Sequence, residues 1–362
     1  MKTKRSWSLL NTDQTPASFW ITNPNNDFTD NHAAGSDRYS YWFDLQIHAM
    51  GPSADVNICP ENEPLGMFRG NHAHSNGRYG LRIFHNLMPR TYPCKAVVYD
   101  PNNSTDPFWQ NPLITANFYN VTSWKNKRNG AIVGAAGDVR FNNFKVADNF
   151  LAGMEMERSD RSGDGKAQFI NSTVVGRTEN TEDMLDLGEP RGVITPRSEN
   201  FTIDGLRFYN YNWNRSAALG TCSHCFHPAA TDSGARTVTV KNLWFDTSVT
   251  RRIWYQFPYH AIFHDLTGTL TNKGPDSWAM GYVRSNSWPE CTVDFAVYDG
   301  HVCDSSHKVR RLAFHDFKNK LVLEGMTMYI LPYDDDLIAA QANVIEYELN
   351  RTNYGMVKFK DK

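Results

Sequence analysis

Four stretches of this sequence share one layout, and that repeat constrains the fold more than any other feature. They read FTDNHAAGSDRYSYWF, FRGNHAHSNGRYGLRI, FYNVTSWKNKRNGAIV and FNNFKVADNFLAGMEM. Each begins with Phe, has Asn or Ser eight residues later, and has Gly or Ser twelve residues later. Their first residues, Phe28, Phe68, Phe118 and Phe141, are 40, 50 and 23 residues apart. The shortest spacing matches one coil of a solenoid, and the longer spacings indicate loop insertions.

The rest of the sequence fits a solenoid built from short strands. Weaker copies follow at AQFINSTVVG, ENFTIDGLRFYNYN and ARTVTVKNLWFDT. Runs of Phe, Tyr, Val, Ile and Thr are broken by Asn, Gly and Asp, which is typical of strands and turns. Gly and Asn tolerate the positive φ that corners require, and Asn repeated at one corner can form an amide ladder. We therefore predict an all-β, right-handed parallel β-helix. An antiparallel β-sandwich is the alternative, but it would need clearer hairpin turns.

The repeat also predicts the domain boundaries. We expect a lead-in over residues 1–18, coils with loop insertions over 19–316, and a small β-rich extension over 317–362. Residues 334–349, DDDLIAAQANVIEYEL, are the single helix-like stretch, with three Asp at the expected start.

Composition and charge exclude some functions. The chain has a formal net charge of −2, so no basic excess draws it to a nucleic-acid backbone. No apolar stretch approaches the roughly 20 residues that span a bilayer, and no apolar run follows the basic N-terminal residues as in a signal peptide. We expect no cofactor and no bound metal.

Several long motifs resemble one family of proteins. FWITNPNNDFTDNHAAGSDRYSYWF and PLGMFRGNHAHSNGRYGLRI are similar to segments of fibrocystin, fibrocystin-L, the cell migration-inducing hyaluronan-binding protein and cell-surface hyaluronidase. RGVITPRSENFTIDGLRFYNY, ALGTCSHC, GARTVTVKNLWFD, AIFHDLTGTLT and PECTVDFAVYDGHVCD look closest to the fibrocystin and fibrocystin-L branch. The resemblance runs from about Phe19 to Phe314.

The resemblance implies a pectin-lyase-like β-helix in an extracellular or cell-surface protein, with further coils and a G8 domain upstream in a full-length form. The fibrocystin branch implies a receptor-like module without established catalysis. The other branch implies hyaluronan binding or depolymerisation. No catalytic residue is carried over from it.

The stretch NHAHSNGR contains a candidate binding site. His72 and His74 are two residues apart, so on a strand they share a face, and with Asn71 and Arg78 they could bind a sugar carboxylate or a metal. Two His without a nearby carboxylate make a poor metal site. The favoured interpretation is therefore that the Asn are corner residues and the His face solvent.

The six cysteines favour an oxidising compartment. We interpret Cys222 with Cys225, in GTCSHCFH, as a disulfide, with metal binding or redox chemistry as alternatives. We also expect a disulfide between Cys291 and Cys303. Cys59 and Cys94 lie in the insertions between coils, which a bond between them could join, and their pairing stays open. Six glycosylation sequons support secretion weakly: Asn103, Asn120, Asn171, Asn200, Asn214 and Asn350.

Catalytic candidates are weak. His264 and Asp265 form a possible acid–base pair, but a strand ending in a polar turn explains them more simply. Asp138 with Arg140 is the other nearby pair. Four arginines would meet uronate carboxylates if they line one face: Arg38, Arg78, Arg140 and Arg191.

Aromatic residues exceed what a solenoid core of Val, Ile and Phe requires, so some must lie outside, where they suit sugar rings or a protein partner: Trp20, Tyr39, Tyr41, Trp42, Trp109, Trp124, Trp213, Trp254, Tyr255, Trp278 and Trp288.

Three functions remain open at this level. The first is an extracellular β-helix that binds a glycan or protein ligand without catalysis. The second is a hyaluronan-type polysaccharide depolymerase. The third is an intracellular β-helix, which leaves the cysteines and sequons unexplained.

Overall fold

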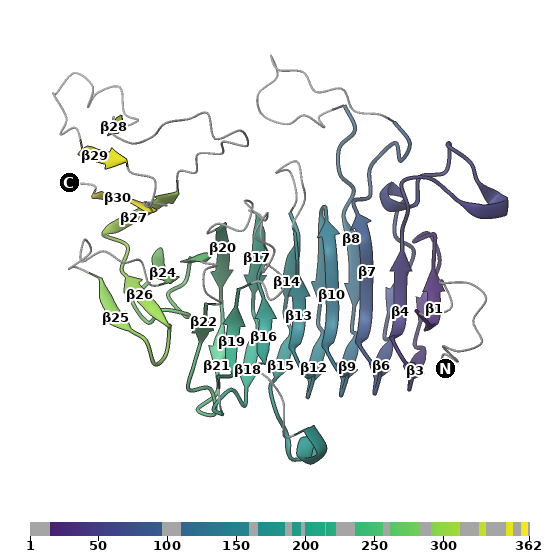
Figure 1. Cartoon of the computed structure of the whole chain (residues 1–362), viewed down its shortest axis with the longest axis horizontal. Helices are drawn as coiled ribbons and strands as arrows, with labels where there is room; N and C mark the ends of the chain where they lie inside the picture. The colour runs from purple at the N-terminus through teal and green to yellow at the C-terminus, as the bar shows by residue number, and fades with distance from the viewer. Residues whose placement is uncertain are drawn as a thin grey trace. The chain divides into compact units, whose positions relative to one another are not determined.

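The computed structural model describes twelve segments of the chain: residues 15–95, 110–158, 166–184, 190–196, 200–213, 215–221, 236–255, 261–281, 291–311, 326–330, 345–349 and 356–360. Their contacts divide the chain into two compact units, Met1–Ser306 and His307–Lys362. The first unit contains a parallel β-helix, whose strands lie in regular array in Figure 1.

Three sheets run along the coils of the first unit. Sheet A has eight parallel strands: β1 (Ala17–Ile21), β4 (Tyr39–Asp44), β7 (Tyr79–Leu87), β10 (Asn129–Ala136), β13 (Ala152–Met156), β16 (Arg191–Ile194), β19 (Ala217–Gly220) and β22 (Ile253–Trp254). Sheet B begins with β2 (Phe28–Thr29), β5 (Phe68–Arg69), β8 (Ala116–Tyr119), β11 (Val139–Asn142), β14 (Gln168–Ile170), β17 (Phe201–Asp204), β20 (Arg236–Lys241) and β23 (Ala261–Asp265). Sheet C contains β3 (His32–Ala34), β6 (His72–His74), β9 (Thr122–Trp124), β12 (Lys145–Ala147), β15 (Thr173–Val175), β18 (Arg207–Tyr209) and β21 (Trp244–Phe245). Coil 1 comprises β1–β3, coil 2 comprises β4–β6, and so on to coil 8, which contains β22 and β23.

The four predicted Phe residues stack on successive coils. Phe28 pairs with Phe68, Phe68 with Phe118, and Phe118 with Phe141. Neighbouring rings lie 6.1, 5.1 and 5.2 Å apart between centroids, and Phe169 continues the column in coil 5. This confirms the repeat, and the predicted parallel β-helix with it.

An amide ladder occupies the corner that leads from sheet C to sheet A. Asn76 Nδ2 donates to Asn126 Oδ1 over 2.7 Å, and Asn126 Nδ2 donates to Asn149 Oδ1 over 2.9 Å. In coil 1 the main-chain N–H of Ser36 donates to Asn76 Oδ1. These side chains are buried, so the ladder satisfies polar groups that would otherwise cost free energy.

Small residues at the third repeat position face the interior. Ser40 donates to the carbonyl of Ala33, while Gly80, Gly130 and Gly153 follow in the next coils. A Cβ added at Gly80 would lie 2.1 Å from Ser123 Oγ. Close approach of two sheets, rather than backbone conformation, therefore selects glycine here.

The corner between sheets B and C uses positive φ, as predicted for Asn and Gly. One such residue occurs in each of coils 1 to 7: Asp30, Gly70, Asn120, Asn143, Asn171, Gly205 and Asn242. Gly, Asn and Asp adopt this conformation at the lowest cost.

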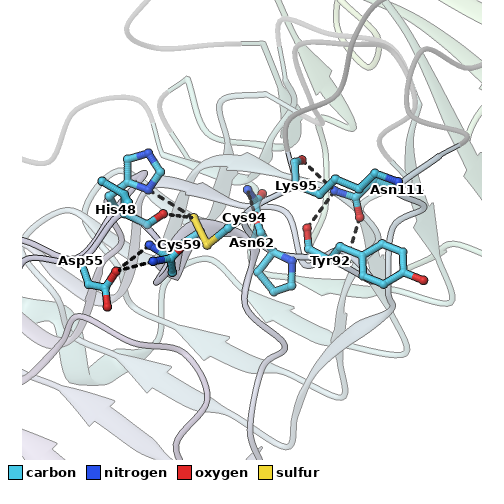
Figure 2. Close-up of a disulfide and its surroundings, with 11 residues drawn as sticks. His48, Asp55, Cys59, Asn62, Tyr92, Cys94, Lys95 and Asn111 are labelled. Atoms are coloured by element: carbon cyan, nitrogen blue, oxygen red, sulfur yellow. Dashed lines mark hydrogen bonds between the residues drawn. A yellow bond between two sulfur atoms is a disulfide. The ribbon is translucent and has the colours of Figure 1, made fainter.

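Insertions between sheets A and B are joined by a disulfide. Residues 45–67 follow β4 and contain η2 (Gly51–Ser53) and η3 (Pro60–Asn62), and the loop after β7 contains Cys94. Cys59 and Cys94 are bonded, with Cα atoms 5.3 Å apart. Figure 2 shows Asn111 holding the carbonyl groups of Tyr92 and Lys95 beside this bond. The disulfide therefore ties loops of two consecutive coils. A further insertion, between β15 and β16, contains η4 (Glu179–Met184).

Among the described strands of this unit, β23 is the last that pairs in parallel with the coil before it. Sheet B continues with antiparallel strands β24 (Ser277–Gly281), β26 (Gly300–Cys303) and β25 (Thr292–Asp294). These strands cover the edge that β23 would leave unpaired.

The second unit contains two antiparallel pairs. β27 (His307–Arg311) pairs with β30 (Met356–Lys360), and β28 (Met326–Ile330) pairs with β29 (Ile345–Leu349). The predicted helix is therefore wrong over 345–349, because IEYEL alternates apolar and polar residues with the period of a strand.

Candidate functional site

The outer face of sheet A carries a group of aromatic rings around one arginine, which we call the Arg82 cluster: Trp20, Tyr39, Trp42, Tyr79, Arg82 and Phe84. The Arg82 guanidinium carbon lies 4.9 Å from the Tyr39 ring centroid and 4.5 Å from that of Phe84. It also donates a hydrogen bond to the Tyr39 hydroxyl. These contacts fix a cation among several ring faces, which attract it electrostatically.

Strand register explains why these residues meet. Trp20, Trp42 and Arg82 occupy one row across β1, β4 and β7, and Tyr39 pairs with Tyr79 in a second row. Coils 1 to 3 therefore each contribute to one surface, although insertions separate them in sequence.

Trp20 is the accessible member of the Arg82 cluster, with 59% of its surface exposed. Its indole Nε1 donates to Asp44 Oδ2 over 3.1 Å, and its ring stacks on Trp42 with centroids 5.7 Å apart. An exposed indole held in one orientation is a preorganised platform for a flat apolar ligand surface, such as a sugar ring.

Polar groups continue along sheet A in coils 4 and 5, but they are buried. Asn129 Nδ2 donates to Glu155 Oε2 over 2.5 Å, and both residues are fully buried. Burial raises the pKa of Tyr79, and the neighbouring Arg128 guanidinium, which hydrogen-bonds to it, partly offsets the rise. This group stabilises the middle of the face and leaves little surface for a ligand.

The predicted histidine pair lies on the outer face of sheet C. His72 and His74 are half-buried there, and His32 stacks on His72 with ring centroids 4.1 Å apart. His74 stacks on Trp124 at 4.2 Å. Burial and the neighbouring histidines lower the pKa of His72 and of His74, so these two rings are mainly neutral near pH 7.

The structure separates the other predicted partners from these histidines. Asn71 is fully buried, its Oδ1 accepts from Asn31 and its Nδ2 donates to the carbonyl of Phe28. It is therefore a corner residue whose amide is already used. Arg78 lies at the opposite corner, where its N–H donates to the carbonyl of Arg38. The four-residue binding site is not assembled.

The four predicted arginines do not line one face. Arg38 and Arg78 stack at the corner before sheet A, and Arg128 continues that stack. Arg140 lies on sheet B, 3.5 Å from Asp138, and Arg191 lies on sheet A in coil 6. Only the first two are neighbours, because Arg140 belongs to a different strand of its coil.

His264 and Asp265 cannot act as an acid–base pair. They are consecutive residues of β23, so their side chains point to opposite faces. Asp265 is fully buried, and its carboxylate accepts hydrogen bonds from the N–H groups of Gly268, Leu270 and Thr271. His264 is on the outer face, where its ring stacks on Trp278. Asp265 closes the turn after β23.

The remaining predicted residues have mixed outcomes. The Cys291–Cys303 disulfide is confirmed, with Cα atoms 4.5 Å apart. Cys222, Cys225, Asn103, Asn214 and Asn350 lie outside the described residues. Asn120, Asn171 and Asn200 are exposed, and their glycosylation stays a prediction. Within the described residues, no three His, Cys, Asp or Glu side chains come together to hold a metal ion.

Comparison with known proteins finds several relatives of this chain. Residues 2–81 match the CEMIP beta-helix family. Fibrocystin-L from Homo sapiens is 30% identical over 326 residues, which are 86% of this chain and 7% of that protein. The cell migration-inducing and hyaluronan-binding protein from Mus musculus is 27% identical, over 80% of this chain and 24% of that protein.

The chain is homologous to fibrocystin-L and the CEMIP proteins. The cell surface hyaluronidase of Danio rerio is a further relative, 26% identical over 80% of this chain and 23% of its own length. The chain thus spans a quarter or less of each of these homologues. No helix among the described residues has the length and apolar character needed to cross a bilayer.

Proposed function

We propose that this chain is an extracellular β-helix module that binds a glycan of the hyaluronan type on the outer face of sheet A and does not cleave it. The observation that carries the proposal is Trp20, an exposed indole held in place by Asp44 and Trp42, whose ring centroid in turn lies 5.8 Å from the Arg82 guanidinium carbon. An aromatic platform beside a cation suits a sugar ring that carries a carboxylate. The names of the CEMIP relatives, which mention hyaluronan, support the choice of ligand.

Two features support an extracellular location. Both described disulfides, Cys59–Cys94 and Cys291–Cys303, persist in oxidising environments. The exposed sequons at Asn120, Asn171 and Asn200 are accessible to modification.

Binding without cleavage is favoured by the state of the candidate acids. The Asp265 carboxylate accepts hydrogen bonds from the turn after β23. The Asp138 carboxylate accepts a hydrogen bond from the Thr115 hydroxyl and contacts Arg140. Cleavage requires an acid and a base within reach of the scissile oxygen. The alternative is a hyaluronan-type depolymerase, which the hyaluronidase relatives favour.

The test uses the whole chain and fluorescently labelled hyaluronan. Trp20→Ala should weaken binding about tenfold, the loss expected for one stacking contact of 1–1.5 kcal/mol. Trp244→Ala is the matched control, because Trp244 is also exposed (46%) but lies on sheet C. Equal effects of both substitutions would refute the sheet A site. Shortening of the polymer on a gel would establish the depolymerase instead.

A further inference from the structure

Between coils 6 and 7 a tight turn closed by Trp213 and Ser216 presents both an indole and a guanidinium. Trp213, Arg215 and Ser216 lie between β18, the last strand of coil 6, and β19, the first strand of coil 7. Ser216 N–H donates to the Trp213 carbonyl over 3.0 Å, and Trp213 N–H donates to Ser216 Oγ over 3.3 Å. The closed turn fixes Trp213 and Arg215 two residues apart.

A hollow of about 360 Å³ lies beside this turn, lined by Arg177, Thr178, Asn210, Asn212 and Trp213. The Arg177 guanidinium carbon lies 5.3 Å from the Trp213 ring centroid, and its Nε donates to Thr181 Oγ1. Asn210 Nδ2 donates to the carbonyl of Arg177. The lining therefore combines a flat apolar ring, amide groups and a positioned cation, which is the chemistry that a polar ring with an anionic substituent needs.

Arg215 joins a second basic group on sheet A. The guanidinium carbons of Arg191, Arg215 and Arg251 lie 5.3, 5.5 and 4.4 Å from the Trp254 ring centroid. Coil 7 leaves space for this arrangement, because a Cβ at Gly220 would come within 2.6 Å of Arg191 Cδ. Arg191 therefore crosses coil 7 and reaches the indole of coil 8.

Asp299 lies beside this group of arginines. Asp299 is the carboxylate coupled to Arg251 and Arg191, and its oxygen accepts from the N–H of Tyr255. Burial raises its pKa, which disfavours its charged form. Guanidinium groups bind carboxylates and sulfates in bidentate fashion, so this end of the face is suited to an oxyanion.

We propose that the turn closed by Trp213 and Ser216 carries a subsite for an acidic oligosaccharide, of which one ring lies in the hollow against Trp213 and whose oxyanions are bound by Arg177 on one side and by Arg215 and Arg251 on the other. The inference rests on the proposed glycan-binding function and names the chemical class of the ligand. The shared chemistry is a carboxylate or a sulfate ester on a sugar. The turn lies about five coils from Trp20, roughly 24 Å at 4.8 Å per coil, so one extended oligosaccharide can reach both.

The experiment measures binding of the whole chain to four labelled probes: a hyaluronan oligosaccharide, its carboxyl-reduced neutral form, a heparin oligosaccharide and polyglutamate. Arg177→Gln and Arg251→Gln should each weaken binding of hyaluronan or heparin about tenfold, as expected for a lost charged hydrogen bond. Binding of the neutral form should not change. Arg207→Gln is the matched control, because Arg207 is an exposed arginine on sheet C. Equal melting temperatures would show that the variants are folded.

The outcomes separate the two proposals. If Trp20→Ala weakens hyaluronan binding while both arginine variants bind normally, the acidic-sugar subsite is refuted and the glycan-binding function stands. If the native chain binds none of the sugars, the proposed function fails. If hyaluronan binding depends on the arginines, the group that they bind is a carboxylate. If only heparin binding depends on them, the group is a sulfate. Equal binding of polyglutamate with the same arginine dependence would overturn the assignment to a sugar.

Discussion

Replacing Asn126 with Ala would interrupt the amide ladder at its centre. Asn126 is fully buried and makes four side-chain hydrogen bonds. Its Oδ1 accepts from the N–H and the Nδ2 of Asn76, and its Nδ2 donates to Asn149 Oδ1 and Ser123 Oγ. The substitution removes all four hydrogen bonds. It leaves a buried space no larger than the lost amide, so bulk water cannot enter.

The cost follows from which groups retain a partner. Asn76 Nδ2 keeps its bond to Ser40 Oγ, and Asn149 Oδ1 still accepts from the main-chain N–H of Asn126. The N–H of Asn76 is left without its acceptor, which costs about 1–3 kcal/mol for a buried group. With the loss of the remaining ladder bonds at about 1 kcal/mol net, we expect the free energy of unfolding to fall by about 2–4 kcal/mol.

Urea unfolding followed by circular dichroism measures this loss, and hydrogen exchange locates it. Exchange should accelerate in coils 2 to 5, because each coil of a solenoid depends mainly on its neighbours. Asn143→Gly is the matched control. Asn143 also bonds an Asn of the preceding coil, Asn120, but at an exposed corner with φ of 55°, which Gly adopts readily. A loss for Asn126→Ala no larger than that for Asn143→Gly would refute the ladder argument.

Three further predictions follow from the fold. Phe68→Ala should lower the free energy of unfolding by about 3–5 kcal/mol, measured by urea denaturation, because Phe68 is fully buried between two ring neighbours; a change below 1 kcal/mol would contradict the stacked column. Removing the Cys59–Cys94 disulfide by a double Ser substitution should cost up to about 4 kcal/mol for its 35-residue separation, seen as a lower melting temperature; an unchanged value would show that the insertions do not contribute. Acidification should destabilise coils 1 to 3: the folded-state pKa of His72 is lowered by burial and by neighbouring histidines, so stability present above the ordinary value of about 6.5 is lost as pH falls through the folded pKa. His72→Gln should flatten this dependence in melting temperatures measured from pH 7.5 to 5, and an unaltered slope would count against it.

Much of the fold was predictable because a coil repeats a short local pattern. The offset from Phe68 to Asn76 to Gly80 lies within one uninterrupted segment, so insertions elsewhere cannot change it. The Phe column, the amide ladder and the positive-φ corners all have this property. The change from parallel to antiparallel pairing after β23 was not predictable, because the amino-acid composition of Ser277–Gly281 does not distinguish the two kinds of pairing. The pairing of Cys59 with Cys94 was not predictable either, since it depends on how two insertions fold.

The outer face of sheet A shows why its residues could not be placed from alternation alone. Tyr39 and Trp42 pack together outside, yet they are three positions apart. Ser40 bonds to the carbonyl of Ala33 and Tyr41 lies in the core, so both face inward. Strict alternation would have put Tyr39 beside Tyr41 in the interior. An irregularity at Ser40 thus decides which aromatic residues are available for a ligand, and strand alternation gives no sign of it.

The arrangement of the arginines around Trp254 depends on Gly220, which has no side chain. Arg191, Arg215 and Arg251 are far apart in sequence, and they meet only because coils of unequal length stack in register. Arg191 reaches Trp254 across coil 7, where the small residues Gly220 and Ala217 leave space for its side chain on the outer surface. A larger residue at position 220 would displace Arg191 while leaving the inner core untouched. In a β-helix, therefore, a small residue on an outer row can shape a surface as directly as the charged residues around it, and Gly220→Val should disrupt the acidic-sugar subsite without the loss of stability expected from a core substitution.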